Sequence, residues 1–277
     1  AEAQAKEARV EISLERIRAR ALAMHSSDEL MEVAKVLREQ LSLLGQPDLE
    51  TSVIHLYEED PDHILSWRAF RSGYDTGNEI TYGYIAIAKN SCEFVRELLT
   101  NYYSNSIEYT IEISGAKQQE WYEQLFKLAP EVVNSMRQKG DIHEKRYYRF
   151  SKFSGGALLM VSKQEPSAEV SYLQKRAAVV FDMAYRRFLD LQKAEAQARE
   201  AQIEASLEKV RSRSLAMHKA EELGEVITVI FEKLKELGFS VSDGVALITF
   251  IEGSKDLLEW MAKPGFPSAA KFYLPYF

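Results

Sequence analysis

The chain has 277 residues, of which 46% are hydrophobic and 28% are charged, and its formal net charge is -7 at pH 7. This is the composition of an ordinary soluble protein that can bury a core, and the acidic balance argues against binding to nucleic acid or to an anionic membrane surface. The lone Cys92 excludes an internal disulfide and a multi-cysteine metal site, and no run of 18 apolar residues predicts a membrane span, so we expect a cytoplasmic protein without membrane contact.

A duplication organises the sequence. Residues 1–45 and residues 194–238 align without a gap, and more than half of the aligned pairs are identical. The two segments read AEAQAKEARVEISLERIRARALAMHSSDELMEVAKVLREQLSLLG and AEAQAREAQIEASLEKVRSRSLAMHKAEELGEVITVIFEKLKELG. A period this long is not that of a solenoid, so it predicts tandem whole domains, each preceded by a helix. The predicted parts are a stalk helix over 1–27, a complete domain over 28–166, a long linker helix over 167–219 and the truncated start of a second domain over 220–277.

The first stalk carries a narrow apolar seam. Its members are spaced alternately four and three residues apart: Val10, Leu14, Ile17, Ala21 and Met24. Such a seam is typical of a coiled coil and predicts that a partner helix covers it. Ser26 and Glu29 form a capping box, which predicts a helix break near 25–27 and a second helix that ends at Gly45.

The first domain is predicted to contain six strands with helices between them. Alternating or β-branched apolar residues mark the strands at 53–57, 64–70, 80–87, 107–113, 143–153 and 157–163. Turn-forming residues at 59–62 and 154–156 join the first two and the last two strands into hairpins. Helical spacing predicts one helix that ends near Tyr102 and another over 122–136, which Pro130 kinks or restarts.

Residues 167–223 contain neither Gly nor Pro and predict one long helix, with a slip in the phase of its apolar seam over 192–202. Beyond it, a helix to Leu237 and strands at 245–251 and 257–261 repeat the start of the first domain. Because Lys219 and Ala220 replace the first copy's serine pair, we expect the second stalk to run straighter. A parallel homodimer through the two stalk seams is expected to use Leu14, Ile17, Met24, Leu207, Val210 and Met217.

No catalytic or metal-binding motif occurs in the sequence: a nucleophile elbow, a P-loop, a dinucleotide fingerprint and HExxH are all absent. His25 recurs as His218, but neither lies in the box typical of a phosphotransfer histidine, so both are interpreted as structural residues at helix breaks. The remaining histidines are too far apart in sequence to suggest a metal site. We therefore expect a protein that is not an enzyme and that holds no metal.

Aromatic residues are concentrated between Tyr57 and Phe153, and most are expected to fill the core. A cavity between a sheet and helices, lined by several aromatics, is also how small-molecule pockets are built. The candidate ligand-binding residues are Trp67, Tyr82, Tyr109, Trp121 and, for an anion, Arg149. Lys145, Arg146 and Lys152 share the strand of Arg149, and an exposed face is the competing interpretation of these cations.

The order of elements, and the segments SLERIRARALAMH and SLEKVRSRSLAMH followed by DEL or EEL, resemble the tandem GAF domains of bacterial sensor proteins with histidine-kinase or cyclase outputs. The resemblance implies an α+β fold, related to the PAS fold, with a six-stranded antiparallel sheet, helices on one side and coiled-coil linker helices in a parallel dimer. It also implies a non-catalytic sensory or regulatory module of signal transduction, as in two-component systems. Such a module binds a small molecule or a partner and relays the signal through its linker helices.

Two departures from the family narrow the implied ligand. Cys92 is followed by Glu93 rather than His, so attachment of a bilin is not implied, and the cyclic-nucleotide signature is absent. We therefore expect no cofactor, neither bilin nor haem. The alternative to a sensor is a ligand-free dimerisation and spacer scaffold, which a solidly filled core would favour. A third interpretation, a methionine sulfoxide reductase, conflicts with the single cysteine because such relatives use several.

Overall fold

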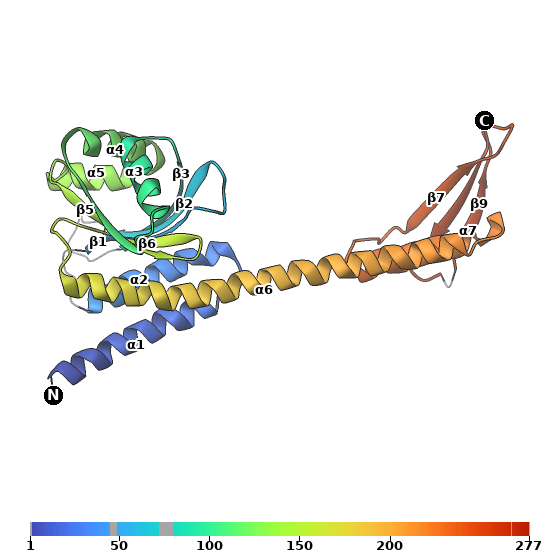
Figure 1. Cartoon of the computed structure of the whole chain (residues 1–277). Coiled ribbons are helices and arrows are strands. Elements are labelled where there is room, and N and C mark those ends of the chain that lie inside the picture. Colours follow the sequence, from blue (N-terminus) through green and yellow to red (C-terminus); the bar gives the residue numbers. More distant parts are fainter. Residues whose placement is uncertain (1, 45–48, 72–79, 267, 277) are drawn as a thin grey trace. The chain divides into compact units, whose positions relative to one another are not determined.

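The computed structural model describes residues 2–44, 49–71, 80–266 and 268–276, and contacts divide the chain into two compact units, Ala1–Asp190 and Leu191–Phe277. The long helix α6 (Ala168–Leu215) begins in the first unit and ends in the second (Figure 1). Both units combine helices with an antiparallel sheet, so the chain belongs to the α+β class.

A six-stranded antiparallel sheet forms the middle layer of the first unit. Its strands are β1 (Leu49–Leu56), β2 (His63–Arg71), β3 (Ile80–Ala88), β4 (Glu108–Ile113), β5 (Arg146–Phe153) and β6 (Gly156–Ser162), in the spatial order β3-β2-β1-β6-β5-β4. Both predicted hairpins are confirmed, with Leu56 opposite Leu65 in one and Phe153 opposite Gly156 in the other. Strands β1 and β6, the first and last of the domain, pair at the centre of the sheet.

Helices cover both faces of this sheet (Figure 1). On one face lie α3 (Glu93–Tyr102), α4 (Gly115–Leu128) and α5 (Pro130–Lys139), and on the other lie α1 (Glu2–Leu22), α2 (Leu30–Leu43) and the first part of α6. The GAF resemblance implied helices on one side only, and this expectation is wrong for the first unit. The reason lies in the central strands, where neighbours such as Val53 and Ile54 point to opposite faces and are both buried.

The apolar seam of α1 is covered by the chain itself. Its five residues are at most 4% exposed and belong to one buried cluster with side chains of α2 and α6. Lys6 pairs with Glu169 near the start of both helices, and Arg176 of α6 pairs with Glu7 (2.7 Å) and Glu11, so α1 and α6 run parallel. The partner helix that the seam predicts is present, but it comes from the same chain. Consequently Leu14, Ile17 and Met24 do not face a second chain in this arrangement.

A helix break recurs at the same place in both copies, where a single 3-10 turn follows each stalk: η1 (Ser27–Glu29) and η2 (Ala220–Glu222). The backbone N–H of His25 donates to the Glu29 carboxylate (2.9 Å), and the N–H of His218 donates to Glu222 (3.1 Å). The straighter second stalk predicted above is therefore wrong. Its break persists because the glutamate that accepts this bond is present in both copies, whereas the serines are not.

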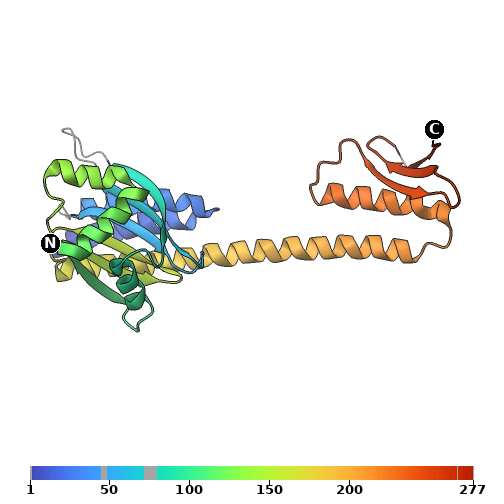
Figure 2. The same ribbon diagram turned by 90° about the horizontal axis from the view of Figure 1, so that it is seen from above.

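The second unit repeats the opening elements of the first. Helix α7 (Leu223–Glu236) lies along a three-stranded antiparallel sheet of β7 (Val245–Phe250), β8 (Leu257–Ala262) and β9 (Ala270–Leu274) (Figure 2). The two predicted strands are confirmed, and Ile227, Trp260 and Ala262 form a small core between helix and sheet. Side chains on the other face of β7 are exposed, Ile248 by 53% and Phe250 by 81%.

Candidate functional site

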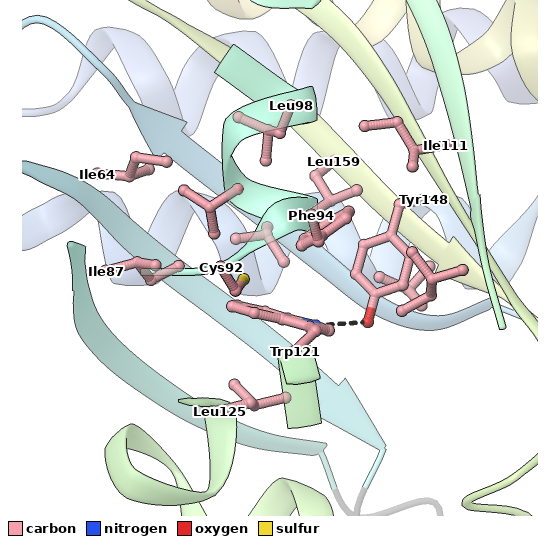
Figure 3. Close-up of a cluster of buried hydrophobic side chains, with 14 of the residues drawn as sticks. Ile64, Ile87, Cys92, Phe94, Leu98, Ile111, Trp121, Leu125, Tyr148 and Leu159 are labelled. Atoms are coloured by element: carbon pink, nitrogen blue, oxygen red, sulfur yellow. Dashed lines mark hydrogen bonds between the residues drawn. The ribbon is translucent and has the colours of Figure 1, made fainter. Parts of the chain in front are cut away.

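A cavity of about 50 Å³ lies inside the first unit, between the sheet and the layer of α3, α4 and α5. Figure 3 shows the apolar side chains around it, including Phe94 of α3, Trp121 and Leu125 of α4, and Leu159 of β6. Apart from the indole N–H of Trp121, the polar groups in its described lining come from the strands: Thr51, His55, Ser66, Arg68 and Tyr148. A mostly apolar wall with a few polar groups on a rigid sheet is the usual construction of a small-molecule site.

Arg68, near the middle of β2, contributes a buried guanidinium to this cavity. Its side chain is 6% exposed, and Nη2 donates to Oε1 of Glu131 in the first turn of α5 (2.6 Å). Nε and Nη1 are buried and have no hydrogen-bond partner among the residues that the structure describes. Burial lowers the pKa of Arg68, and the Glu131 carboxylate opposes this shift. Since an unpartnered buried N–H group costs about 1 to 3 kcal/mol, an acceptor that enters the cavity gains a strong interaction here.

Gly83 makes room for the arginine head group. It lies directly opposite Arg68 on the neighbouring strand β3. A β-carbon at position 83 would lie 2.9 Å from both Nε and Nη2 of the guanidinium, which is closer than such atoms approach in proteins. The position of the guanidinium therefore depends on a glycine at this point of β3.

Two neutral pairs account for other polar groups around the cavity. Burial lowers the pKa of His55 to about 3, so its imidazole is neutral at physiological pH, and Nδ1 lies 3.1 Å from the Tyr57 hydroxyl. Trp121 Nε1 donates to the Tyr148 hydroxyl at 3.0 Å (Figure 3). Among the residues that the structure describes, Arg68 is the one charged member of the lining.

Trp121 lies in the cavity wall, but Trp67 and Tyr82 lie on the opposite face of the sheet. Trp67 packs against the Tyr84 ring, with the centroids 5.1 Å apart. The Tyr82 ring has the Lys35 ammonium of α2 above it at 5.3 Å. Alternation along a strand explains this placement, because Trp67 and Arg68 are neighbours and must point to opposite faces.

Tyr109 and Arg149 also lie outside the cavity lining. Tyr109 is buried and stacked on Phe150, with ring centroids 4.6 Å apart. Arg149 points away from the cavity face that its neighbour Tyr148 occupies, and it pairs with Glu108 at 3.3 Å. Of the five predicted ligand-binding residues, the structure therefore brings one to the cavity.

The cations of β5 do not form a common anion-binding face. Arg146 is fully buried, with Nε 2.5 Å from a Glu50 oxygen and Nη2 3.2 Å from Asp141. Lys163 adds a second cation to Asp141 at 2.5 Å. Burial raises the pKa of Glu50, and the Arg146 charge opposes that shift. This ionic cluster links the start of β1, the segment before β5 and the end of β6. Its role is therefore structural.

The strands that line the cavity carry the helix layer of α1, α2 and α6 on their other face. On β6, Leu159 lines the cavity, whereas its neighbour Leu158 belongs to the cluster that includes α6. The buried side chain of Gln174 on α6 donates to the backbone oxygens of Arg149 and Leu158, each at 2.9 Å. Helix α6 is therefore bonded directly to the backbone of β5 and β6.

Sequence reasoning missed Arg68, although the sequence contains a signal for it. Along β2 the residues that face the cavity layer include Ile64, Ser66 and Arg68, so a charged residue falls on a face that is otherwise buried. An arginine in such a position needs a specific partner. The alternation of β2 by itself identifies it as a candidate.

No protein-family model matches this chain, and no curated protein sequence is significantly similar to it. In the part of the chain that the structure describes, no group of three or more His, Cys, Asp or Glu side chains is arranged to hold a metal ion. Over the same residues, no helix combines the length and the apolar character needed to cross a membrane. Function must therefore be inferred from the cavity and the elements around it.

Proposed function

We propose that the first unit is a non-catalytic sensory or regulatory domain of a cytoplasmic bacterial signalling protein, which binds a small molecule in the cavity and passes its bound state to α6. The observation that carries this proposal is the buried Arg68 guanidinium, with two nitrogens unpartnered among the described residues at an otherwise mostly apolar cavity. A buried cation with incomplete bonding weakens a core. It is, however, the kind of group that orients a ligand.

The proposed domain is GAF-like, and the output domain that it regulates is a histidine kinase or a cyclase. Three features of the chain support it: the antiparallel six-stranded sheet, the helices that lead into and out of the domain, and the duplication at the period of a whole domain. The same features suit a domain that is connected in series with others through helices.

The relay to α6 would run through the two hairpins whose strands line the cavity. Asp182 of α6 accepts a hydrogen bond from the backbone N–H of Ser154 in the β5–β6 turn (2.7 Å). The Tyr185 hydroxyl donates to Glu59 in the β1–β2 turn (3.0 Å). A ligand that shifts these strands changes the contacts that α6 makes at both turns. The position of α6 then differs in free energy between the ligand-bound and ligand-free states, as a conformational signal requires.

A parallel homodimer is part of this proposal. Leu207 on α6 is 57% exposed, and Val210 and Met217 are half-buried, so this seam is accessible to a second chain. The seam of α1 is not, because α2 and α6 cover it. We therefore assign the contact between chains to the later part of α6.

Native mass spectrometry of the full chain purified from cells tests both parts of the proposal. The expected spectrum is that of two chains plus a small non-covalent adduct, which is released when the protein unfolds. A dimer without an adduct would favour the spacer scaffold, which the small size of the cavity also favours. A monomer would rule out dimerisation by α6 under those conditions.

A further inference from the structure

We propose that the cavity ligand is a short-chain monocarboxylate of about two to four carbons, whose carboxylate binds the Arg68 guanidinium in place of Glu131. This ligand class rests on the proposed regulatory function and specifies its binding site. It follows from the bonding of Arg68, from the position of Glu131 and from the size of the cavity.

The bonding of Arg68 is incomplete in a way that suits a carboxylate. A guanidinium offers two forks, Nε with Nη2 and Nη1 with Nη2, and each fork matches the two oxygens of one carboxylate. Glu131 engages Nη2 through Oε1 (2.6 Å), whereas Nε and Nη1 are buried and unpartnered among the described residues. A ligand carboxylate that replaces Glu131 completes either fork and satisfies one of these nitrogens.

Glu131 can leave this pair at low cost. Its side chain is 48% exposed, so its carboxylate is already partly hydrated while the arginine is buried. It is also the second residue of α5, where the partial positive charge of the helix N-terminus stabilises a carboxylate. Glu131 thus acts as a resident competitor that keeps the guanidinium neutralised until a ligand arrives.

The size and lining of the cavity limit the rest of the ligand. One water needs roughly 10 to 15 Å³, so a cavity of about 50 Å³ holds about three to five such groups. This is enough for the one to three tail carbons of such an acid, whose carboxylate takes the place of the Glu131 carboxylate. Its walls are aliphatic and aromatic, as at Ile64, Phe94 and Leu159, which suits a short hydrocarbon tail. A phosphate dianion is disfavoured because Arg68, the one cation in the described lining, would have to compensate two charges in an apolar environment.

Isothermal titration calorimetry of the full chain with acetate, propionate, butyrate and octanoate tests this proposal. At least one of the three short acids should bind, with octanoate weaker by tenfold or more. Propionamide, which has nearly the same shape as propionate but no charge, should bind at least tenfold more weakly than propionate. The titrations should run from micromolar to millimolar acid, because small ligands gain limited free energy per atom and an acid that is retained through purification binds at the tight end of that range.

Four variants assign the binding to Arg68. Arg68→Met removes the charge and should abolish propionate binding, and Gly83→Ala, which displaces the guanidinium, should weaken it at least tenfold. Glu131→Gln removes the competing charge and should tighten binding severalfold. Arg149→Met is the matched control, since it removes an arginine from the opposite face of the sheet, and it should leave the affinity unchanged. Circular dichroism of each variant verifies that the fold is retained.

Several results would overturn the proposal: equal binding of propionamide, equal binding of octanoate, or unchanged affinity in folded Arg68→Met. If no carboxylate binds but native mass spectrometry finds a retained neutral molecule, the ligand class is wrong and the regulatory function stands. If no carboxylate binds and no molecule is retained, both proposals fail.

Discussion

Replacement of Arg146 by methionine should lower the free energy of unfolding of the first unit by about 3 to 5 kcal/mol, the usual result of breaking a buried ion pair. Arg146 is fully buried, and its loss leaves Glu50 and Asp141 with uncompensated charge in the interior. Asp141 retains Lys163, so Glu50 bears most of the effect. Urea denaturation of the full chain, followed by tryptophan fluorescence, measures the loss.

The pH dependence of the Arg146→Met variant provides a second check. Burial already raises the pKa of Glu50, and removal of the Arg146 charge raises it further. When the pKa of a carboxyl is higher in the folded than in the unfolded protein, the folded protein loses stability as the pH rises through the pKa of the folded state. The destabilisation of Arg146→Met should therefore be smaller at mildly acidic than at mildly alkaline pH.

Lys145→Met is the matched control, because Lys145 directly precedes Arg146 and its side chain is exposed. This variant should change the free energy of unfolding by less than about 0.5 kcal/mol. An equal loss in both variants would contradict the structural role of Arg146.

Replacement of Trp121 by alanine should also cost about 3 to 5 kcal/mol, the range for truncation of a large buried aromatic residue. Its side chain is 5% exposed, packs against Phe94 with ring centroids 5.0 Å apart, and donates to the Tyr148 hydroxyl. The enlarged cavity should at the same time weaken the binding of any ligand that touches the indole. Urea denaturation measures the first effect and calorimetry with propionate the second.

Trp121→Phe separates packing from hydrogen bonding. It keeps an aromatic ring against Phe94 but removes the donor to Tyr148, so about 0.5 to 1.5 kcal/mol should be lost through the hydrogen bond, with a further loss for the smaller ring. A full loss of stability in Trp121→Ala with unchanged binding would remove Trp121 from the ligand site.

Local patterns in the sequence predicted most elements of the first unit because their causes are local. Pro130 restarts a helix at its first position, and Gly140 adopts a left-handed conformation (φ 72°) that ends it. The turn at 59–62 joins β1 to β2 as expected. What the patterns could not show was which helix covers the α1 seam, since an internal partner and a second chain bury the same residues.

The candidate site was harder to predict because it depends on which face of each strand meets which helices. Aromatic residues were selected for their type, but Trp67 and Tyr82 lie on the face toward α2, and Tyr109 fills the core. Arg68, the residue with incomplete bonding, is marked in the sequence only by the alternation of β2, because a charge within an apolar strand has no fixed motif. Its partner Glu131 is 63 positions away in sequence, and such long-range pairs cannot be read from local spacing.

Hydrogen exchange of the full chain, with and without saturating propionate, tests most directly the claim that occupation of the cavity reaches α6. Slower exchange is predicted in the strands that line the cavity and, across the sheet, in the part of α6 that carries Gln174, Asp182 and Tyr185. The Arg68→Met variant should show neither change. Slower exchange confined to the cavity lining, with α6 unaltered, would contradict the proposed relay.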